Sequence, residues 1–389
     1  MGNCVTEQHS DKDDVSVITK THFKFKYVIG KGGFGKVWKV QQKKTDGYFA
    51  MKVMLKSRIL AKRSVSSVMN ERNLLAKLKH SFLVNMHFAF QDRENLFVIL
   101  DHLDGGDMRY HISWKKKFTE EQTKFFMSNI IIALEYIHNL GVVHRDIKPE
   151  NLVFDSNGYM RIIDFGIARV LTQENHKDTS GTPGYMAPEV MCRQNHGISV
   201  DYFALGVIAF ECMFGKRPYY GKNRKAIRDH ILSKQVKIKR QDIPKGWSIE
   251  AADFINKLIQ RKPVNRLGLS GPKELISHPW FADFDWEAVK SKRAISPFVP
   301  PQNKDNFDTK YANEPWKDED SDLMKKQNEL VKQAHIQALF EGYYYTRLSE
   351  YSSAVSIIRS EIPARKRKKN RNNALSLSTY GSNLNTKEA

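Results

Sequence analysis

Hydrophobic and polar residues alternate along the first hundred positions of this chain. At residues 23–29, Phe23, Phe25, Tyr27 and Ile29 stand at every second position, which predicts a β-strand. A glycine cluster at residues 30–35 interrupts the alternation. Further extended runs are centred on residues 37–40, 48–54, 86–88 and 96–100. Together they predict a small β-sheet.

Helical spacing occurs once within this region and dominates after it. Over residues 63–78 the spacing places Val68, Leu75 and Leu78 on one face of a helix. Residues 119–139 predict a long amphipathic helix, and residues 200–213 predict another apolar one. The core candidates of the long helix are Phe125, Phe126, Ile130, Ile132, Leu134 and Ile137. The pattern therefore indicates a small sheet with one helix, followed by a mainly helical part.

The C-terminal quarter is expected to be less regular. The compact part is predicted to end near residues 279–281, and residues 282–320 are rich in Pro, Asn and Asp. A helix is predicted over residues 322–341, with Ser321 or Asp322 as its cap and Gly342 as its stop.

Composition narrows the class of protein. The chain has 389 residues and a formal net charge of +20. This charge attracts nucleic acid, anionic membrane or acidic protein, and a solvated basic surface explains it equally well. The sequence has no apolar run long enough for a transmembrane helix and no secretory signal. The three cysteines, Cys4, Cys192 and Cys212, indicate a reducing compartment without a disulfide framework.

The glycine cluster is the first candidate for chemistry. Gly30, Gly32 and Gly35 follow the pattern G-x-G-x-x-G-x-V, and glycines allow a backbone to approach phosphate oxygens closely. Dinucleotide-binding folds use the same glycines, and an ordinary hairpin turn is the other alternative. Because the loop joins two predicted strands, it does not fit the strand-to-helix turn of a dinucleotide-binding fold.

A charged pair is the second candidate. Lys52 lies in a predicted strand, and Glu71 follows 19 residues later on the predicted helix. An ion pair between them fixes a lysine against the α- and β-phosphates of a nucleotide, whereas a solvated edge lysine is the simpler alternative.

The most specific pattern is His-Arg-Asp-Ile-Lys-Pro-Glu-Asn at residues 144–151, followed by Asp-Phe-Gly from Asp164. Asp146 is suited to accept the proton of an attacking hydroxyl, and Lys148 to neutralise charge on a transferred phosphoryl group. Asn151 and Asp164 are candidate metal ligands. Phosphoryl transfer requires positioning and charge neutralisation, which this ordered set supplies.

With these motifs, residues 23–281 resemble the eukaryotic protein kinase domain. The resemblance implies a two-lobed α+β fold with a small antiparallel sheet and one helix in the N-terminal lobe and a mainly helical C-terminal lobe. It implies an ATP-dependent protein serine/threonine kinase with ATP and Mg²⁺ in the cleft. Residues 1–22 are expected to be a flexible terminus, 282–345 a C-terminal tail and 346–389 a basic disordered tail.

The resemblance also assigns site residues. The catalytic residues are Asp146, Lys148, Lys52 and Glu71, and the metal ligands are Asn151 and Asp164. The implied ATP contacts are Gly30, Lys31, Gly32, Gly33, Phe34, Gly35, Val37, Ala50, Lys52, Leu100, Asp101, Leu103, Asp107, Val153 and Phe307. The implied structural positions are Met86, Leu75, Phe165 and His144 in a regulatory hydrophobic stack, Asp201 and Gly206 behind the catalytic loop, and an ion pair of Glu189 with Arg266.

Subfamily features favour the AGC group of serine/threonine kinases. Lys-Pro-Glu-Asn at 148–151 and Gly-Thr-Pro at 181–183 favour serine and threonine over tyrosine, and Asn-Phe-Asp at 306–308 resembles the tail of that group. Residues 340–345 resemble its aromatic docking motif, with an unrelated aromatic stretch as the alternative. Within the group, residues 82–85, 90–92 and 105–111 and the short lipidation-type N-terminus look like those of the YANK kinases, although the chain keeps Gly166 where they carry Asn.

Regulation and substrate choice follow from the same resemblance. Asp178 stands where relatives carry a phosphothreonine, so either Thr179 is phosphorylated by an upstream kinase or Asp178 supplies the charge, with Arg145 and Arg169 as partners. The phosphorylation of Thr179 is the favoured alternative. Protein substrates are expected to carry basic residues near the phosphoacceptor. The implied substrate-binding residues are Asp107, Glu150, Glu211 and Thr182. The alternative is that Asp107 contacts only the ribose of ATP and that the two glutamates only support local structure.

The N-terminus fits a lipidation motif. Gly2 is a candidate for myristoylation and Cys4 for palmitoylation, and the basic cluster at residues 365–371 is a further candidate for membrane contact. A nuclear-localisation patch and a solvated tail are the alternatives for this cluster. The expected protein is a cytoplasmic, membrane-associated monomer that takes part in signalling and has no specific nucleic-acid partner. A membrane-associated pseudokinase scaffold is the alternative function, and a basic nucleic-acid binder is a third.

Overall fold

The computed structural model describes residues 18–172, 174–175, 177–302, 306–307 and 321–347. The chain divides into two units, residues 1–344 and 345–389. In the second unit the described residues include one short strand, β10 (Tyr345–Thr346). The elements described below belong to the first unit.

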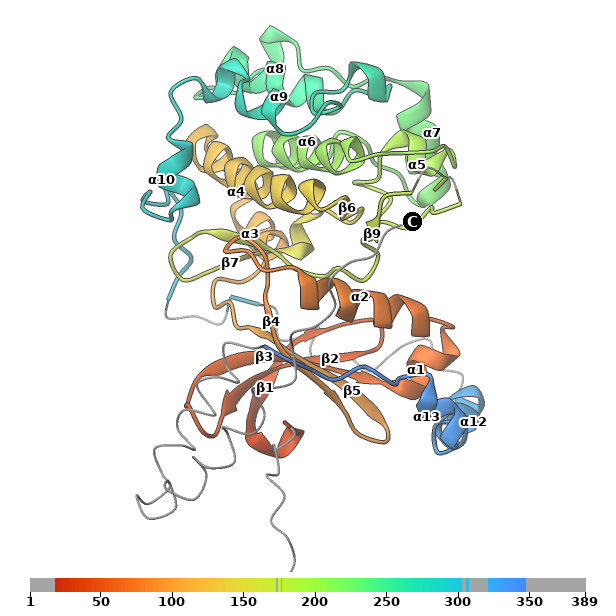
Figure 1. Ribbon diagram of the computed structural model, residues 1–389. Coiled ribbons are helices and arrows are strands. Elements are labelled where there is room, and N and C mark those ends of the chain that lie inside the picture. The colour runs from red at the N-terminus through yellow and green to blue at the C-terminus, as the bar shows by residue number, and fades with distance from the viewer. Residues whose placement is uncertain (1–17, 173, 176, 303–305, 308–320, 348–389) are drawn as a thin grey trace, which may run out of the picture. The chain divides into compact units, whose positions relative to one another are not determined.

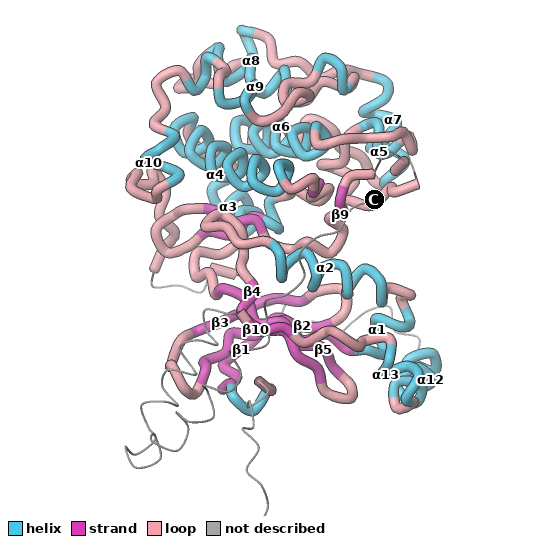
Figure 2. The backbone as a smooth tube through the Cα atoms, in the orientation of Figure 1, coloured by secondary structure: helices cyan, strands magenta, loops and turns pink. Residues whose placement is uncertain are grey.

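An antiparallel sheet forms the N-terminal part of this unit (Figures 1 and 2). Its strands are β1 (Phe23–Lys31), β2 (Gly35–Gln42), β3 (Tyr48–Leu55), β4 (Met86–Gln91) and β5 (Asn95–Asp101). They lie in the order β1-β2-β3-β5-β4, and all neighbouring pairs are antiparallel. A core cluster on this sheet includes Phe23, Met51, Phe97 and Ile99. The predicted sheet is confirmed, and β1 extends into the glycine cluster as far as Lys31.

Two helices follow strand β3. The predicted helix forms as α2 (Val65–Lys77), and Val68 and Leu75 on its expected face are buried. A second helix, α1 (Lys56–Ala61), begins directly where β3 ends and was not predicted. The N-terminal part therefore has one more helix than the pattern indicates, because no glycine, proline or polar cluster separates α1 from the strand before it.

The C-terminal part is mainly helical and is built around two buried helices, α4 (Glu120–Asn139) and α6 (Ser199–Phe214). A capping box of Thr119 and Gln122 begins α4, and Gly215, with φ of 72°, ends α6. The other helices are α3 (Met108–Lys115), α5 (Pro188–Met191), α7 (Arg224–Ser233), α8 (Ile249–Leu258), α9 (Lys273–Ile276) and α10 (Trp286–Lys290). The expected α+β fold is confirmed.

Two short strand pairs hold the loops next to the sheet. Strand β6 (Val142–Val143) pairs with β9 (Arg169–Val170), and β7 (Leu152–Phe154) pairs with β8 (Met160–Ile162). The segments that carry the predicted catalytic residues start and end at these pairs. They are therefore fixed at both ends.

The segment after residue 281 contributes to the core. Phe298 is 5% exposed and packs against four aromatic rings, those of His111, Phe118, Phe126 and Phe154. The buried core thus continues past the predicted end of the compact part.

The predicted C-terminal helix is divided into α12 (Ser321–Val331) and α13 (Ala334–Ala338). Helix α1 lies beside α12 at the end of the sheet (Figure 1). The last of these helices ends at Ala338 with Leu339 as its C-cap, so the predicted stop at Gly342 is wrong; Gly342, with φ of 74°, lies in the turn that follows.

Candidate functional site

The glycine loop lies between β1 and β2. The amide of Gly32 donates to the carbonyl of Gly35 at 2.8 Å, which closes a tight turn. A Cβ atom at Gly35 would meet the carbonyl oxygen of Val53 at 1.7 Å, so this position requires glycine. The Lys62 ammonium donates to the carbonyl of Gly33 at 2.9 Å. The loop backbone is therefore held in place by these contacts. Contact of Lys31, Phe34 and the other predicted loop residues with phosphate stays a prediction.

The predicted pair of Lys52 and Glu71 is present. The two side chains form an ion pair of 2.6 Å between β3 and α2. Burial alone lowers the pKa of Lys52, but the charges of Glu71 and Asp164 outweigh it, so the pKa is raised. Lys52 is therefore a fixed positive charge that faces the carboxylate of Asp164.

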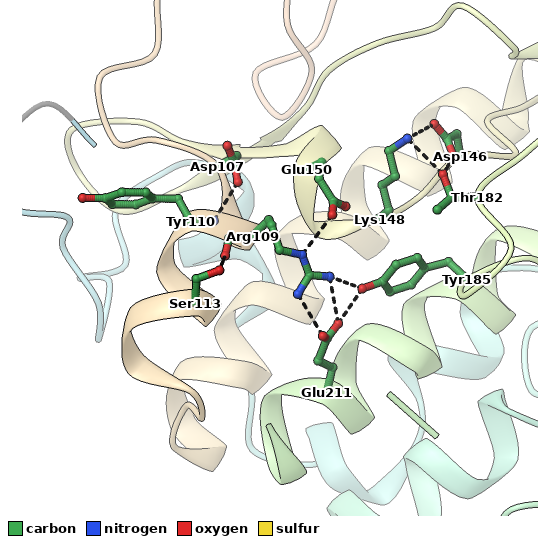
Figure 3. A network of polar contacts seen from close by, with 10 residues as sticks. All are labelled: Asp107, Arg109, Tyr110, Ser113, Asp146, Lys148, Glu150, Thr182, Tyr185 and Glu211. Atoms are coloured by element: carbon green, nitrogen blue, oxygen red, sulfur yellow. Dashed lines mark hydrogen bonds and ion pairs between the residues drawn. The ribbon is translucent and has the colours of Figure 1, made fainter. Parts of the chain in front are cut away.

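Three side chains converge on the carboxylate of Asp146. The Lys148 ammonium donates at 2.6 Å, the Asn151 amide at 3.0 Å and the Thr182 hydroxyl at 2.7 Å. Lys148 also donates to the Thr182 hydroxyl at 3.0 Å. Thr182 comes from a separate segment, so this cluster joins the two segments that a substrate hydroxyl would have to approach (Figure 3).

A buried aspartate fixes the backbone of this catalytic loop. The carboxylate of Asp201 accepts the amides of His144 and Arg145 at 2.9 and 2.8 Å, and His138 contacts the same carboxylate at 2.8 Å. Arg145 has φ of 69°, a conformation that a non-glycine residue adopts only when its surroundings impose it. Asp201 therefore lies behind the catalytic loop, as the resemblance to the kinase domain implies.

Asn151 and Asp164 fit a magnesium site. Burial raises the pKa of Asp164, but Lys52, the Gly166 amide and other nearby charges outweigh it and hold the pKa below its ordinary value. The carboxylate is therefore ionised at neutral pH. The Asn151 amide nitrogen donates to Asp146, and its oxygen accepts no hydrogen bond from the described residues. Hard oxygen donors of these two kinds are those that Mg²⁺ prefers.

The link after β5, where adenine contacts are predicted, is anchored by Asp101. The Asp101 carboxylate is contacted at 2.8 Å by each of Asn85, His87 and Arg161. Burial raises its pKa, but these partners lower the pKa to about 2. The resemblance to the kinase domain implies an ATP contact at Asp101, but this network of side chains was not predicted.

The other predicted adenine contacts surround this link. Ala50 pairs with Leu100 across β3 and β5, while Leu103 and Val153 are half-buried. Phe307 stacks on Tyr27 with 6.0 Å between ring centroids, and the neighbouring Asn306 donates to the carbonyl of Asp104 at 3.0 Å. The third residue of this motif, Asp308, lies outside the described residues. Direct contact of these residues with ATP stays a prediction.

The predicted hydrophobic stack and structural ion pair are present. Met86, Leu75, Phe165 and His144 are all buried, and the rings of His144 and Phe165 lie 5.2 Å apart. Arg266 contacts both carboxylate oxygens of Glu189, at 2.6 and 2.9 Å. Gly206 lies where α6 meets α8, and a Cβ atom there would come within 2.5 Å of the Leu258 side chain.

In the segment before Gly181, a carboxylate contacts the catalytic loop. Asp178 forms an ion pair of 2.9 Å with Arg145, whose side chain is 4% exposed. Arg145 also donates to the carbonyl of Ile167 at 2.8 Å. The backbone carbonyl of the neighbouring Thr179 accepts from Arg224 at 2.8 Å. The charge expected near this arginine is thus present on Asp178, and the phosphorylation of Thr179 stays a prediction.

Two of the carboxylates expected to bind substrate arginines contact an arginine of the chain itself (Figure 3). Arg109 on α3 contacts Glu150 at 2.9 Å and Glu211 at 2.9 and 3.2 Å. Tyr185 donates to Glu211 at 2.5 Å and accepts from Arg109. Asp107 caps α3 by accepting the Tyr110 amide at 2.8 Å. Sequence analysis missed Arg109, because the pairing joins four separate segments.

The predicted membrane features lie mostly outside the described residues. Gly2, Cys4 and the basic cluster at residues 365–371 belong to the parts that the structure does not describe. Among the described residues, none of the helices is both long and apolar enough to span a bilayer.

Comparison with known proteins gives a consistent result. The protein kinase domain family matches residues 23–281. Protein kinase 2 of Dictyostelium discoideum is 38% identical over 283 residues, which cover 72% of this chain and 58% of that protein. Serine/threonine-protein kinase sgk-1 of Caenorhabditis elegans is 36% identical, with 72% and 61% covered. For Sgk1 of Rattus norvegicus these values are 36%, 75% and 69%. The chain spans about three fifths of the length of the first two relatives.

Proposed function

Because the chain belongs to the protein kinase domain family, we propose that it transfers the γ-phosphoryl group of ATP to serine and threonine side chains of proteins. The observation that carries this proposal is the cluster on Asp146, in which Lys148, Asn151 and Thr182 contact one carboxylate. Two of the named relatives, sgk-1 and Sgk1, are serine/threonine-protein kinases, which supports the resemblance to the AGC group. The finer resemblance to YANK kinases stays a prediction.

The residues divide the work of phosphoryl transfer. Asp146 accepts the proton of the attacking hydroxyl, while Lys148, 2.6 Å away, stabilises negative charge on the transferred group. Lys52, fixed by Glu71, orients the α- and β-phosphates. Asn151 and Asp164 would hold Mg²⁺, which would neutralise charge on the phosphates. These assignments rest on the match to the family and on the geometry above.

The alternative of a pseudokinase scaffold requires a broken catalytic set. Lys52, Asp146, Asn151 and Asp164 are all present, and the Lys52–Glu71 ion pair is formed. This alternative is therefore not favoured.

A transfer assay tests the proposal. Purified chain is incubated with labelled ATP and Mg²⁺ and a mixture of serine- and threonine-containing peptides, with the Asp164→Ala variant in parallel. We expect label on peptide that requires Mg²⁺ and falls at least about 100-fold in the variant, the typical effect of losing one preorganised charge. Normal ATP binding without any transfer by the unaltered chain would favour the scaffold.

We further propose that acylation of Gly2 and Cys4 brings the kinase to membrane surfaces, with residues 365–371 as an additional basic contact. A single myristoyl chain binds membranes only marginally, so a second signal is needed. Co-sedimentation of the acylated chain with vesicles of mixed neutral and anionic lipids tests this. Gly2→Ala should abolish binding, and unchanged binding of that variant would contradict acylation as the anchor.

Fewer carboxylates than expected from the sequence are available to bind a basic residue near the phosphoacceptor. Glu150 and Glu211 are paired with Arg109, so among these carboxylates only Asp107 has no ion pair with a described residue. We propose that any selection for a basic substrate residue acts through Asp107. Burial raises the pKa of Asp107 to about 6, so this carboxylate is ionised at neutral pH and is able to bind a cation.

A further inference from the structure

The group formed by Arg109, Glu150, Tyr185 and Glu211 lies next to the predicted transfer site. Glu150 is two residues from Lys148 in the same loop. The Tyr185 amide donates to the carbonyl of Thr182 at 2.9 Å, and the Thr182 hydroxyl donates to Asp146 at 2.7 Å. The group is therefore connected through Thr182 to the carboxylate on which a substrate hydroxyl would be positioned (Figure 3).

The carboxylate of Glu211 has no room for a second guanidinium. Its side chain is 7% exposed, and both oxygens are already contacted by Arg109 in a bidentate arrangement. The Tyr185 hydroxyl adds a hydrogen bond of 2.5 Å. A bidentate arginine–carboxylate pair is among the strongest polar contacts in proteins. A substrate arginine would have to displace Arg109 from Glu211 and leave this half-buried guanidinium without its bidentate partner.

Glu150 by itself does not provide a binding site for a substrate arginine. Its side chain is 45% exposed, and the Arg109 Nε atom contacts it at 2.9 Å. Arg109 belongs to the same chain, so it does not have to be recruited from solution, whereas a substrate arginine does. The internal arginine is therefore the favoured occupant of the group.

We propose that Arg109 is a specificity-determining residue that fills the acidic subsite beside the phosphoacceptor from within the chain. The kinase then accepts substrates that carry a neutral residue at the position facing Glu211 and gains nothing from an arginine there. The proposal rests on the proposed function, because it defines the substrate class of the same site.

Peptide binding tests the proposal without turnover. Peptides with alanine in place of the phosphoacceptor carry either arginine or alanine at each upstream position in turn. Their dissociation constants are measured with the full chain and with Arg109→Leu. For the unaltered chain we expect Glu211 to contribute no arginine preference. For Arg109→Leu we expect a preference of at least about tenfold at one upstream position, the effect of one charge-assisted hydrogen bond.

Two controls assign the effect. The double variant Arg109→Leu with Glu211→Gln should lose the new preference, and Arg93→Leu, which removes an exposed arginine far along the chain from this group, should not create one. An unchanged preference in folded Arg109→Leu would overturn the proposal.

If Arg109→Leu does not fold, peptide binding by the unaltered chain still tests the proposal. An arginine preference that Glu211→Gln abolishes would refute the proposal, whereas its absence, or a preference that only Asp107→Asn abolishes, would support it. Because binding is measured with a peptide that cannot be phosphorylated, failure of the transfer assay would count against the proposed function and not against this inference.

Discussion

At the scale of single residues, Lys52 is a half-buried charge with a defined partner. A lysine in a strand normally points its ammonium group into water, but that of Lys52 is 2.6 Å from Glu71 and near Asp164. The raised pKa keeps it charged throughout the neutral range. Its position is what a nucleotide phosphate would require.

Replacing this lysine should therefore abolish most of the transfer without unfolding the protein. We expect Lys52→Met to lower kcat/KM for ATP at least about 100-fold, because one preorganised charge is lost. The matched control is Lys20→Met, which removes a half-exposed lysine paired with Asp92 at 2.9 Å and should change the rate less than about twofold. Equal rates for Lys52→Met and the unaltered chain would contradict the role of Lys52.

Asp178 is the second residue whose charge matters. It contacts Arg145, which follows His144 in the catalytic loop, at 2.9 Å. This carboxylate links the segment before Gly181 to that loop, although solvent weakens the ion pair because the Asp178 side chain is 46% exposed. This observation favours Asp178, whereas the sequence alone favoured Thr179.

The two alternatives make opposite predictions. If Asp178 supplies the charge, Asp178→Asn lowers the transfer rate about fivefold, which corresponds to about 1 kcal/mol, and Thr179→Val changes it little. If a phosphate on Thr179 is required, Thr179→Val is inactive and Asp178→Asn is nearly normal. Initial rates of both variants, with phosphate on Thr179 quantified by mass spectrometry, separate these outcomes.

At the scale of elements, the segment after α13 stabilises the helix that carries Glu71. Phe340 and Tyr343 are fully buried, and the carbonyl of Phe340 accepts from Gln91 at 2.9 Å. Arg72, next to Glu71 on α2, donates to the carbonyl of Tyr343 at 3.1 Å. The aromatic motif therefore docks on the N-terminal part of the fold, and Arg72 connects it to α2.

Truncating the docked ring should release this segment. We expect Phe340→Ala to destabilise docking by about 3 kcal/mol and to increase amide hydrogen exchange over residues 334–344, because the cavity cannot refill. Tyr343→Phe is the matched control, since its hydroxyl is buried without a hydrogen-bond partner among the described residues. Equal exchange in the unaltered chain and Phe340→Ala would contradict the docking.

A buried lysine reports on the same contact. The Lys56 ammonium donates to the carbonyl of Asp92 at 2.8 Å and to the Gln337 side chain at 2.6 Å, and it lies 5.1 Å from the Phe340 ring. Burial lowers its pKa to about 8, despite the opposing charge of Asp92. Between this value and 10.5 the unfolded chain holds a proton that the folded chain lacks, so stability from this group rises with pH.

Thermal unfolding between pH 7.5 and 9.5 tests this linkage. The melting temperature of the unaltered chain relative to Lys56→Met should rise across this range. The exposed Lys332, which is paired with Glu329 at 2.6 Å, provides a control, because Lys332→Met should follow the unaltered chain. A constant difference between Lys56→Met and the unaltered chain would show that Lys56 keeps its proton.

At the scale of the whole molecule, local signals predicted most elements and motif residues. Periodicity predicted the strands and the long helices, the spacing of the motif residues predicted the pairing of Lys52 with Glu71, and the resemblance to the kinase domain implied the pairing of Arg266 with Glu189. These signals depend on neighbouring positions or on a motif of constant length, so one sequence is sufficient to read them.

The features that were missed depend on segments that meet only in the folded chain. Arg109 contacts residues 41, 76 and 102 positions away, and no local pattern encodes such a meeting. The buried Phe298 lies in a stretch whose composition indicates irregular structure. Composition therefore predicts the net charge of the chain and its broad class of protein. It does not predict which charged side chains pair with one another.

The most direct test of the central claim is the identity of the phosphorylated amino acids. Purified chain is incubated with labelled ATP, Mg²⁺ and a mixed protein substrate, with Asp146→Asn in parallel, and the product is hydrolysed and separated. We predict phosphoserine and phosphothreonine as the products of the unaltered chain. Their amounts should fall at least about 100-fold with Asp146→Asn, because the general base is lost. Phosphotyrosine as the main product, or equal incorporation by Asp146→Asn, would contradict the account.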